Sequence, residues 1–222
     1  YGMTENCGLS HSTVLGKPQP GTVGTTYDGV QCRIDPVSGE IQIKGECVML
    51  GYYKQPEVTR ETFTTDGWLK TGDKGTVDAK GNLRITGRVK DLFKTGKGKY
   101  VAPAPIENKL ATHSAIEACC VTGANLGQPL GLLMLNPEAA VKARDAAGRK
   151  ALEASLAEHL KAVNAQLDPH EQMDCLVVTT EPWSVENDIL TPTMKVKRNK
   201  IEDLFAKNYE NWVGTRKKVV WI

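Results

Sequence analysis

The chain has 222 residues, of which 40% are hydrophobic and 24% are charged, and its formal net charge is +2. This composition is that of a globular protein of one or two domains, and the small net charge gives no support to a nucleic-acid-binding protein. The sequence has no apolar run of the about 18 residues that a membrane-spanning helix needs.

The cysteines and histidines predict neither a metal site nor a catalytic triad. The six cysteines form no CxxC pair, and none has a histidine at zinc-finger spacing. Cys119 and Cys120 lie in an apolar run, so we expect core or near-core thiols in a reducing compartment. Four histidines have no triad or ligand spacing and are assigned no chemistry: His11, His113, His159 and His170.

Residues 1–87 predict a β-rich unit. Residues 39–45 alternate apolar and polar side chains, which is typical of a half-buried strand. Pro56 begins a short helix over 56–63, and the turn signal at 78–82 precedes a strand over 83–86. Short strands with glycines between them favour a small barrel or sandwich.

From residue 88 the pattern changes to alternating strands and helices. Apolar runs at 116–122, 130–136 and 175–180 predict buried strands. Helices are expected over 106–113, 150–167 and 199–208, and the second of these places Leu152, Leu156 and Leu160 at helical spacing. The result is an α+β unit in which helices pack against a small sheet. The change of pattern places a boundary near residues 88–91.

Asp73 and Arg88 are the first candidates for binding chemistry. Asp73 ends the segment TGD, which we interpret as a tight glycine turn. Its carboxylate could accept hydrogen bonds from the vicinal hydroxyls of a ribose, or only bond its own backbone as turn aspartates do. The Arg88 guanidinium could bind ribose or phosphate oxygens, although a lone arginine at a strand end is more often solvated.

Lysines and glycines supply the other candidates. The loop TGKGK at 95–99 follows Lys94 and lacks Walker spacing, so it either approaches a ligand with its backbone or is a plain hairpin loop. Lys90 lies where packing signals are fewest, and a surface lysine is the simpler interpretation. Lys195 lies in a basic segment, for which a solvated face is the alternative; without interleaved aromatics, nucleic-acid binding is disfavoured.

Four segments occur in an order that few chains share: YGMTE at 1–5, GYYKQPEVTRETFTTDGWLKTGD at 51–73, GRVKD at 87–91 and LTPTMKVKR at 190–198. With these segments the chain resembles the adenylate-forming (AMP-binding) acyl-CoA synthetases, most of all the long-chain fatty acid CoA ligases. The resemblance covers essentially the whole chain and implies the C-terminal part of a larger enzyme. Residues 1–87 would be the β-rich, barrel-like remnant of a large N-terminal domain. Residues 88–91 would be a hinge, and 92–222 a mobile α+β C-terminal domain.

The resemblance implies a role for each nucleotide-binding candidate. Tyr1 stacks on adenine, Thr4 contacts phosphate, and Glu5 binds Mg²⁺. Asp73 binds the ribose hydroxyls and Arg88 contacts the nucleotide. One further position, Ile85, packs on the adenine face.

The resemblance also implies a role for the lysines and the glycine loop. Lys90 is the hinge residue, and Lys94 matches a lysine that some members use in the second half-reaction. Gly96 and Gly98 line the tunnel for the pantetheine arm. Lys195 is the catalytic lysine of the first half-reaction. Alignment on Arg198 selects it, but Met194 replaces the usual glycine before this lysine, so Lys197 stays as the alternative.

The implied activity is a two-step ligation. ATP and a carboxylic acid, here a long-chain fatty acid, give acyl-adenylate and pyrophosphate; coenzyme A then gives the thioester and AMP. The implied cofactors are ATP/AMP, Mg²⁺ and coenzyme A, with no nucleic-acid partner. We expect a cytoplasmic enzyme, and a peripheral membrane association of the parent stays open. The chain alone is expected to be inactive, because the phosphate-binding loop and the acyl pocket are absent.

Two alternatives remain open. The first is an adenylate-forming enzyme with a different acceptor, such as a carrier-protein thiol. The second is a non-catalytic interaction module that keeps only the fold. The sequence gives neither the acyl chain length nor the oligomeric state.

Overall fold

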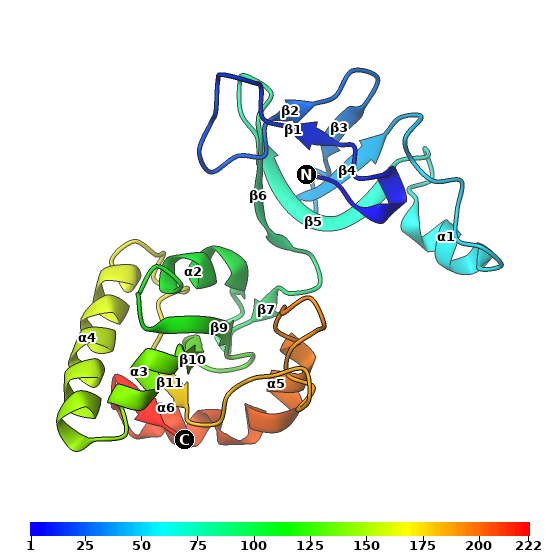
Figure 1. Cartoon of the computed structure of the whole chain (residues 1–222). Coiled ribbons are helices and arrows are strands. Elements are labelled where there is room, and N and C mark those ends of the chain that lie inside the picture. The colour runs from blue at the N-terminus through cyan, green and yellow to red at the C-terminus, as the bar shows by residue number, and fades with distance from the viewer. The chain divides into compact units, whose positions relative to one another are not determined.

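The computed structural model describes all residues from 1 to 222, and the chain divides into two compact units, Tyr1–Lys90 and Asp91–Ile222 (Figure 1). Each unit has its own hydrophobic core. None of the helices combines the length and the apolar character that crossing a membrane requires.

The first unit is built on an antiparallel sheet with the strand order β3-β4-β5-β6. The strands are β3 (Gln31–Ile34), β4 (Glu40–Lys44), β5 (Leu69–Val77) and β6 (Leu83–Arg88). A separate two-stranded sheet pairs β1 (His11–Ser12) with β2 (Thr25–Thr26), and two short helical segments complete the unit: η1 (Thr4–Asn6) and α1 (Pro56–Thr62). The predicted strands at 39–45 and 83–86 and the helix at 56 are confirmed.

The sheet of the first unit curls, as the long bend of β5 shows in Figure 1, but its strand order is linear and does not close. Ile41 and Ile43 of β4 are fully buried and form the core with Leu83 of β6. The barrel-like expectation therefore corresponds to a curled open sheet. Ile41 and Ile43 lie on the same face of the sheet, because successive side chains of a strand point to opposite faces.

The prediction of a tight turn at Thr71–Asp73 is wrong. These residues lie inside the nine-residue strand β5. Gly72 has φ +73°, and the pairing of β4 with β5 shifts register between Glu40 and Gln42. The Gly72 N–H donates to the Glu40 carboxylate at 2.8 Å. A glycine in the left-handed region is typical of a β-bulge, which re-aims the neighbouring side chain within a continuous strand.

The second unit has a mixed sheet with the strand order β12-β11-β10-β9. The antiparallel pair joins β9 (Ile116–Thr122) to β10 (Leu130–Leu135), whereas β11 (Leu176–Thr179) lies parallel to both β10 and β12 (Val219–Trp221). A small hairpin of β7 (Phe93–Lys94) and β8 (Tyr100–Val101) begins the unit. The three predicted buried strands are thus confirmed.

Helices cover both faces of this sheet. The core on one face contains side chains of α2 (Pro103–Leu110), α3 (Pro137–Lys142) and α4 (Ala146–Asn164). The core on the other face contains side chains of α5 (Arg198–Phe205) and α6 (Tyr209–Gly214), which the turn η2 (Ala206–Asn208) connects. Leu133 and Leu135 of β10 enter the first core, and Leu132 and Met134 enter the second. A sheet buried on both faces requires such a continuous apolar strand.

Two predicted helix starts are wrong by a few residues. α2 begins at Pro103 rather than Ile106, because proline needs no hydrogen-bonded N–H in the first turn and presets the helical φ. α4 begins at Ala146 rather than 150, where the Asp145 side chain caps the N–H groups of Ala147 and Gly148.

Cys120 and Cys175 are buried in the second core, whereas Cys119 is only half-buried. Burial raises the pKa of Cys120 to about 12, so this thiol stays protonated, and its sulfur accepts a hydrogen bond from Arg198 Nη1 at 3.3 Å. The prediction of core thiols is confirmed.

Candidate functional site

Asp73 is held between two side chains of the first unit. Asp73 on β5 lies opposite Arg88 on β6 in the sheet register. Arg88 Nε donates to one carboxylate oxygen of Asp73 at 3.1 Å, and the Tyr1 hydroxyl, 72 residues away in sequence, donates to the other at 2.7 Å. The Asp73 side chain is 15% exposed and that of Arg88 is 67% exposed. The structure therefore brings together Tyr1, Asp73 and Arg88, which the sequence analysis proposed as separate candidates.

The protonation of Tyr1 fixes the direction of this hydrogen bond. Burial, followed by the nearby Asp73 carboxylate, raises the pKa of the Tyr1 phenol well above its usual value. The phenol therefore stays protonated and donates to Asp73. The cluster presents a half-buried carboxylate, which accepts hydroxyl donors, beside an exposed guanidinium, which binds anions.

Thr4, Glu5 and Ile85 are not joined to the Asp73 cluster by any hydrogen bond or ion pair. Thr4 and Glu5 lie on the turn η1, and Glu5 Oε1 accepts the Tyr52 hydroxyl at 2.7 Å. Ile85 is an exposed apolar side chain on β6, opposite Gly75. An exposed isoleucine on an edge strand leaves an apolar surface open to a flat ligand.

The glycine loop at 95–99 is the connection of the β7–β8 hairpin, as the simpler interpretation predicted. Gly98 has φ +78°, which side chains rarely adopt. The Gly96 N–H donates to the Leu126 carbonyl at 2.7 Å, and a Cβ at this position would lie 2.6 Å from the Asn125 carbonyl oxygen. The fold itself therefore requires both glycines. Lys94 is exposed beside this loop, and its ammonium lies 5.9 Å from the centre of the Tyr100 ring.

Lys195 lies at the end of a tight hairpin turn. Leu190 and Val196 form an antiparallel bridge, and the Met194 N–H donates to the Thr191 carbonyl at 2.8 Å. The Thr191 N–H donates in turn to the Lys195 carbonyl at 2.8 Å. Residues 192–194 thus form a three-residue hairpin loop. The last position of such a loop, here Met194, adopts the left-handed conformation and usually holds glycine. The backbone at Lys195 is therefore fixed, whereas its side chain is exposed.

The three cations that follow Lys195 up to residue 200 are paired, but Lys195 is not. Lys197 pairs with Asp188, and Lys200 lies 3.7 Å from the same carboxylate. No ion pair involves Lys195. An ammonium without a partner is free to meet anionic ligands, so this contrast favours Lys195 over Lys197.

Arg198 and Glu107 anchor the hairpin to the body of the second unit. Arg198 Nη2 donates to both carboxylate oxygens of Glu107, at 2.7 and 2.8 Å, and Nη1 donates to the Val121 carbonyl at 2.8 Å. A longer ion pair of 3.8 Å joins Arg198 to Asp91. Sequence reasoning used Arg198 only as an alignment marker and missed Glu107, because a helical glutamate gives no sign of its partner 91 residues later.

Met194 occupies the hairpin position that favours glycine, with φ +61°. We expect Met194→Gly to raise the free energy of unfolding by about 0.5–1 kcal/mol, because the strain of a left-handed side chain exceeds the entropy that glycine adds to the unfolded chain. Urea denaturation measures this change. Met194→Ala keeps the Cβ and should give no gain, so equal stability of the two variants would contradict the expectation.

The comparisons with known proteins identify the family of the chain. Residues 90–213 match the model of the AMP-binding enzyme C-terminal domain, and the chain therefore belongs to this family of adenylate-forming enzymes. It is 33% identical to the long-chain-fatty-acid–CoA ligase FadD15 of Mycobacterium bovis over 95% of this chain and 37% of that protein. It is 34% identical to the long-chain-fatty-acid–CoA ligase 5 of Rattus norvegicus over 92% of this chain and 33% of that protein.

A solved structure with a similar fold is the A-PCP didomain of carboxylic acid reductase from Segniliparus rugosus in complex with AMP. It has a TM-score of 0.71 and 25% sequence identity, and the match covers 87% of this chain and 28% of that chain. The chain thus spans about a third of the length of the curated relatives it matches.

Proposed function

We propose that this chain is the C-terminal segment of an ATP-dependent acyl-CoA ligase that activates a long-chain fatty acid. The observation that carries the proposal is the free ammonium of Lys195 on a rigid hairpin, surrounded by cations that are already paired. The relatives named as long-chain-fatty-acid–CoA ligases supply the substrate class.

In the first half-reaction, a carboxylate oxygen of the fatty acid attacks the α-phosphorus of ATP. The bond from this phosphorus to the bridging oxygen breaks, and pyrophosphate leaves with the bond's electron pair. The Lys195 ammonium neutralises the carboxylate and the α-phosphate, two anions that must approach each other. A mobile lysine suits this role because it carries a compact charge on a flexible stem.

The first unit would hold the nucleotide. The ribose hydroxyls donate to Asp73, which accepts one hydrogen bond on each oxygen and has further lone pairs. Arg88 contacts the ribose or a phosphate, Thr4 donates to a phosphate, and the adenine lies between Tyr1 and Ile85. The AMP complex of the reductase didomain supports a nucleotide at such a fold.

Mg²⁺ fits the donor set around Glu5. One carboxylate oxygen of Glu5 accepts the Tyr52 hydroxyl and the other has no partner within the protein. Mg²⁺ is commonly bound through one or two carboxylates together with substrate phosphates, so a single carboxylate is sufficient. When bound, the ion neutralises charge on the leaving pyrophosphate.

In the second half-reaction, the coenzyme A sulfur attacks the acyl carbonyl and AMP leaves with its oxygen. We propose that Lys90 is the hinge about which the second unit turns between the steps. The loop with Gly96 and Gly98 would then line the path of the pantetheine arm beside Lys94. One domain can serve both steps because a hinge lets different groups face the same carbonyl.

A carrier-protein thiol is the second candidate acceptor. The specific observation in its favour is the likeness to a reductase didomain whose described structure includes a carrier-protein part. We place the enzyme in a reducing compartment such as the cytoplasm, since all six cysteines are free thiols. The proposal also includes a peripheral association of the full-length enzyme with a membrane surface.

The chain alone should catalyse no palmitate-dependent exchange between ATP and labelled pyrophosphate, whereas the full-length parent enzyme should. The reason is that, by its resemblance, the chain carries neither the family's phosphate-binding loop nor the acyl pocket. The exchange assay on both proteins checks this result. Exchange by the isolated chain would contradict the proposal that part of the active site lies outside this chain. A full-length enzyme without exchange activity would contradict the proposed function.

A further inference from the structure

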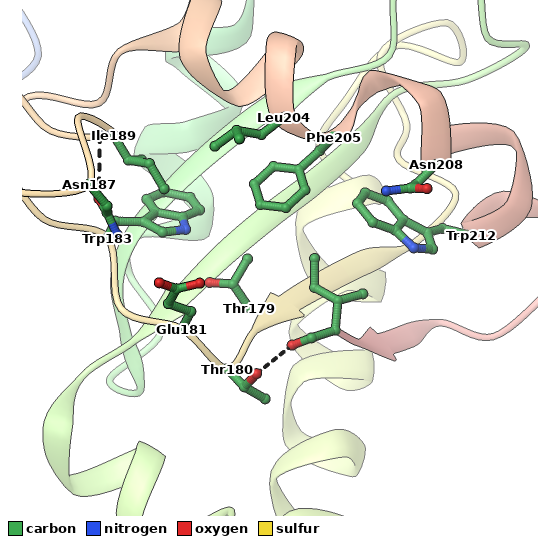
Figure 2. Close-up of a pocket in the computed structure, with 11 residues that line it drawn as sticks. Thr179, Thr180, Glu181, Trp183, Asn187, Ile189, Leu204, Phe205, Asn208 and Trp212 are labelled. Atoms are coloured by element: carbon green, nitrogen blue, oxygen red, sulfur yellow. Dashed lines mark hydrogen bonds between the residues drawn. The ribbon is translucent and has the colours of Figure 1, made fainter.

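The second unit contains a cavity that none of the predicted site residues lines. Its volume is about 600 Å³, which lies within the range of small-molecule sites. Figure 2 shows the cavity between the end of β11, the segment that follows it, and the helices of the opposite wall. The lining comprises Thr179, Thr180, Glu181, Trp183, Asn187, Ile189, Leu204, Phe205, Asn208, Trp212 and Ile222.

Aromatic rings form much of the cavity wall. The rings of Phe205 and Trp212 have centroids 6.0 Å apart and planes tilted by 47°, and Trp183 lies across from them (Figure 2). Ile189 and Leu204 add aliphatic surface. Walls of this kind favour a flat apolar body that can stack against a ring face.

Most polar side chains of the lining are already engaged. The Thr179 hydroxyl donates to the Leu133 carbonyl at 3.2 Å, and the Thr180 hydroxyl donates to the Ile222 carbonyl at 2.7 Å. The Asn187 side chain accepts from the Ser184 N–H and donates to the Pro182 carbonyl, each at 2.9 Å. The polar groups left to define a ligand are therefore few.

The indole N–H of Trp183 is one of these groups. Trp183 is only 3% exposed, and its Nε1 has no hydrogen-bond partner within the protein. Figure 2 shows this nitrogen on the side of the ring that faces the cavity, toward Thr179 and Glu181. A buried donor without an acceptor is rare and costs free energy. A ligand that presents an acceptor at this point would satisfy it.

Two further lining side chains are free, the Glu181 carboxylate and the Asn208 amide, since neither makes a side-chain hydrogen bond within the protein. Glu181 takes part in no ion pair, and Figure 2 shows its carboxylate turned toward the cavity. The lining contains no lysine, arginine or histidine. This carboxylate disfavours anions, which separates the cavity chemically from nucleotide phosphates, coenzyme A and fatty carboxylates. It favours a ligand with an N–H donor.

We propose that this cavity binds a planar aromatic carboxamide or a neutral heteroaromatic molecule of the same hydrogen-bonding pattern. The ring stacks against the aromatic wall, an acceptor receives the Trp183 N–H, and an N–H group donates to Glu181. The proposal does not depend on the ligase reaction, because no residue of the cavity is assigned to it.

The test uses two ligands of the same shape that differ in charge: quinoline-3-carboxamide and quinoline-3-carboxylate. Each is titrated into the whole chain while two-dimensional NMR follows the assigned indole N–H signals of the four tryptophans. We expect a saturable shift of the Trp183 signal with the amide. The carboxylate should bind at least about tenfold more weakly, because the like charge of Glu181 opposes it. The Trp68 signal is an internal control, since Trp68 belongs to the first unit.

A variant separates the role of Glu181 from simple stacking. Glu181→Gln removes the charge at an exposed position, so the preference for amide over carboxylate should fall to about threefold or less, as expected when a charge-assisted hydrogen bond is lost. Glu186→Gln, an equally exposed change five residues along the same segment, should leave the preference unchanged. No saturable Trp183 shift with the amide, equal binding of both compounds, or an unchanged preference in Glu181→Gln would each overturn the proposal.

Discussion

Lys195→Ala in the full-length parent enzyme should slow acyl-adenylate formation about 100- to 1,000-fold, the range found when a preorganised transition-state charge partner is removed. Thioester formation from supplied acyl-adenylate should stay close to the wild-type rate. The physical reason is that Lys195 carries the only ammonium of the 194–200 segment without an ionic partner. In the proposed mechanism its charge acts where two anions meet, and this occurs only in the first half-reaction. Pyrophosphate exchange and single-turnover thioesterification measure the two steps separately.

Lys197→Ala is the matched control for this prediction. Lys197 is already paired with Asp188, so its removal should change pyrophosphate exchange by no more than about threefold, as for other exposed ion pairs. If Lys197→Ala removed exchange and Lys195→Ala retained it, the catalytic role would belong to Lys197. If Lys195→Ala slowed both half-reactions equally, the lysine would serve the fold or general binding rather than adenylation.

The second large effect concerns stability. Glu107→Ala should lower the free energy of unfolding of the second unit by about 3–5 kcal/mol, because it leaves a mostly buried guanidinium with only its longer ion pair to Asp91. Glu107 is 16% exposed and Arg198 is 24% exposed. Glu107 also accepts the Val121 N–H at 2.7 Å, so the change leaves a strand N–H without its acceptor. Urea denaturation followed by tryptophan fluorescence reports mainly on the second unit, which holds three of the four tryptophans: Trp183, Trp212 and Trp221.

Two further variants show whether the loss comes from the buried charge. Glu117→Ala, on an exposed carboxylate of β9, should stay within about 0.5 kcal/mol of the wild type. Adding Arg198→Met to Glu107→Ala should recover part of the loss, since the unpaired charge is then gone. A loss below about 1 kcal/mol in Glu107→Ala would show that the pair behaves as a surface salt bridge.

Much of the second unit could be predicted because its strands are continuous apolar runs. The β9 segment at Ile116–Thr122 was predicted to the residue, and β10 and β11 to within one residue at either end. Strands buried on both faces leave this signal in the sequence whatever their neighbours are.

The missed elements lack such a signal. β5 contains Gly72 and Gly75, which interrupt the apolar alternation, so a bulged strand was interpreted as a turn. α3 and α6 have six residues each and β12 has three, and elements this short depend on tertiary packing rather than on local pattern. These short elements are stabilised by packing against the two hydrophobic cores of the second unit. The cores are made of residues distant in sequence, so a local stretch of sequence does not reveal them.

The candidate site also has features that the sequence indicates and features that only the structure gives. Its residue types could be predicted from motifs, but their pairing could not. Nothing in the sequence relates Tyr1 to Asp73 or Glu107 to Arg198. The two residues of each pair are far apart in sequence and meet only in the folded structure. The left-handed backbone of Met194 gives a physical reason why this hairpin position favours glycine.

The most direct test of the central claim is thioester formation by the full-length parent enzyme from fatty acids ranging from octanoate to stearate, with ATP and coenzyme A. Mass spectrometry would identify the acyl product, and AMP would be measured in parallel. The account predicts acyl-CoA and AMP in equal amounts, with the longer acids preferred. AMP without acyl-CoA, with the acyl group instead on a carrier protein, would contradict the coenzyme A step. No AMP from any acid would contradict the assignment of this chain to a fatty acid ligase.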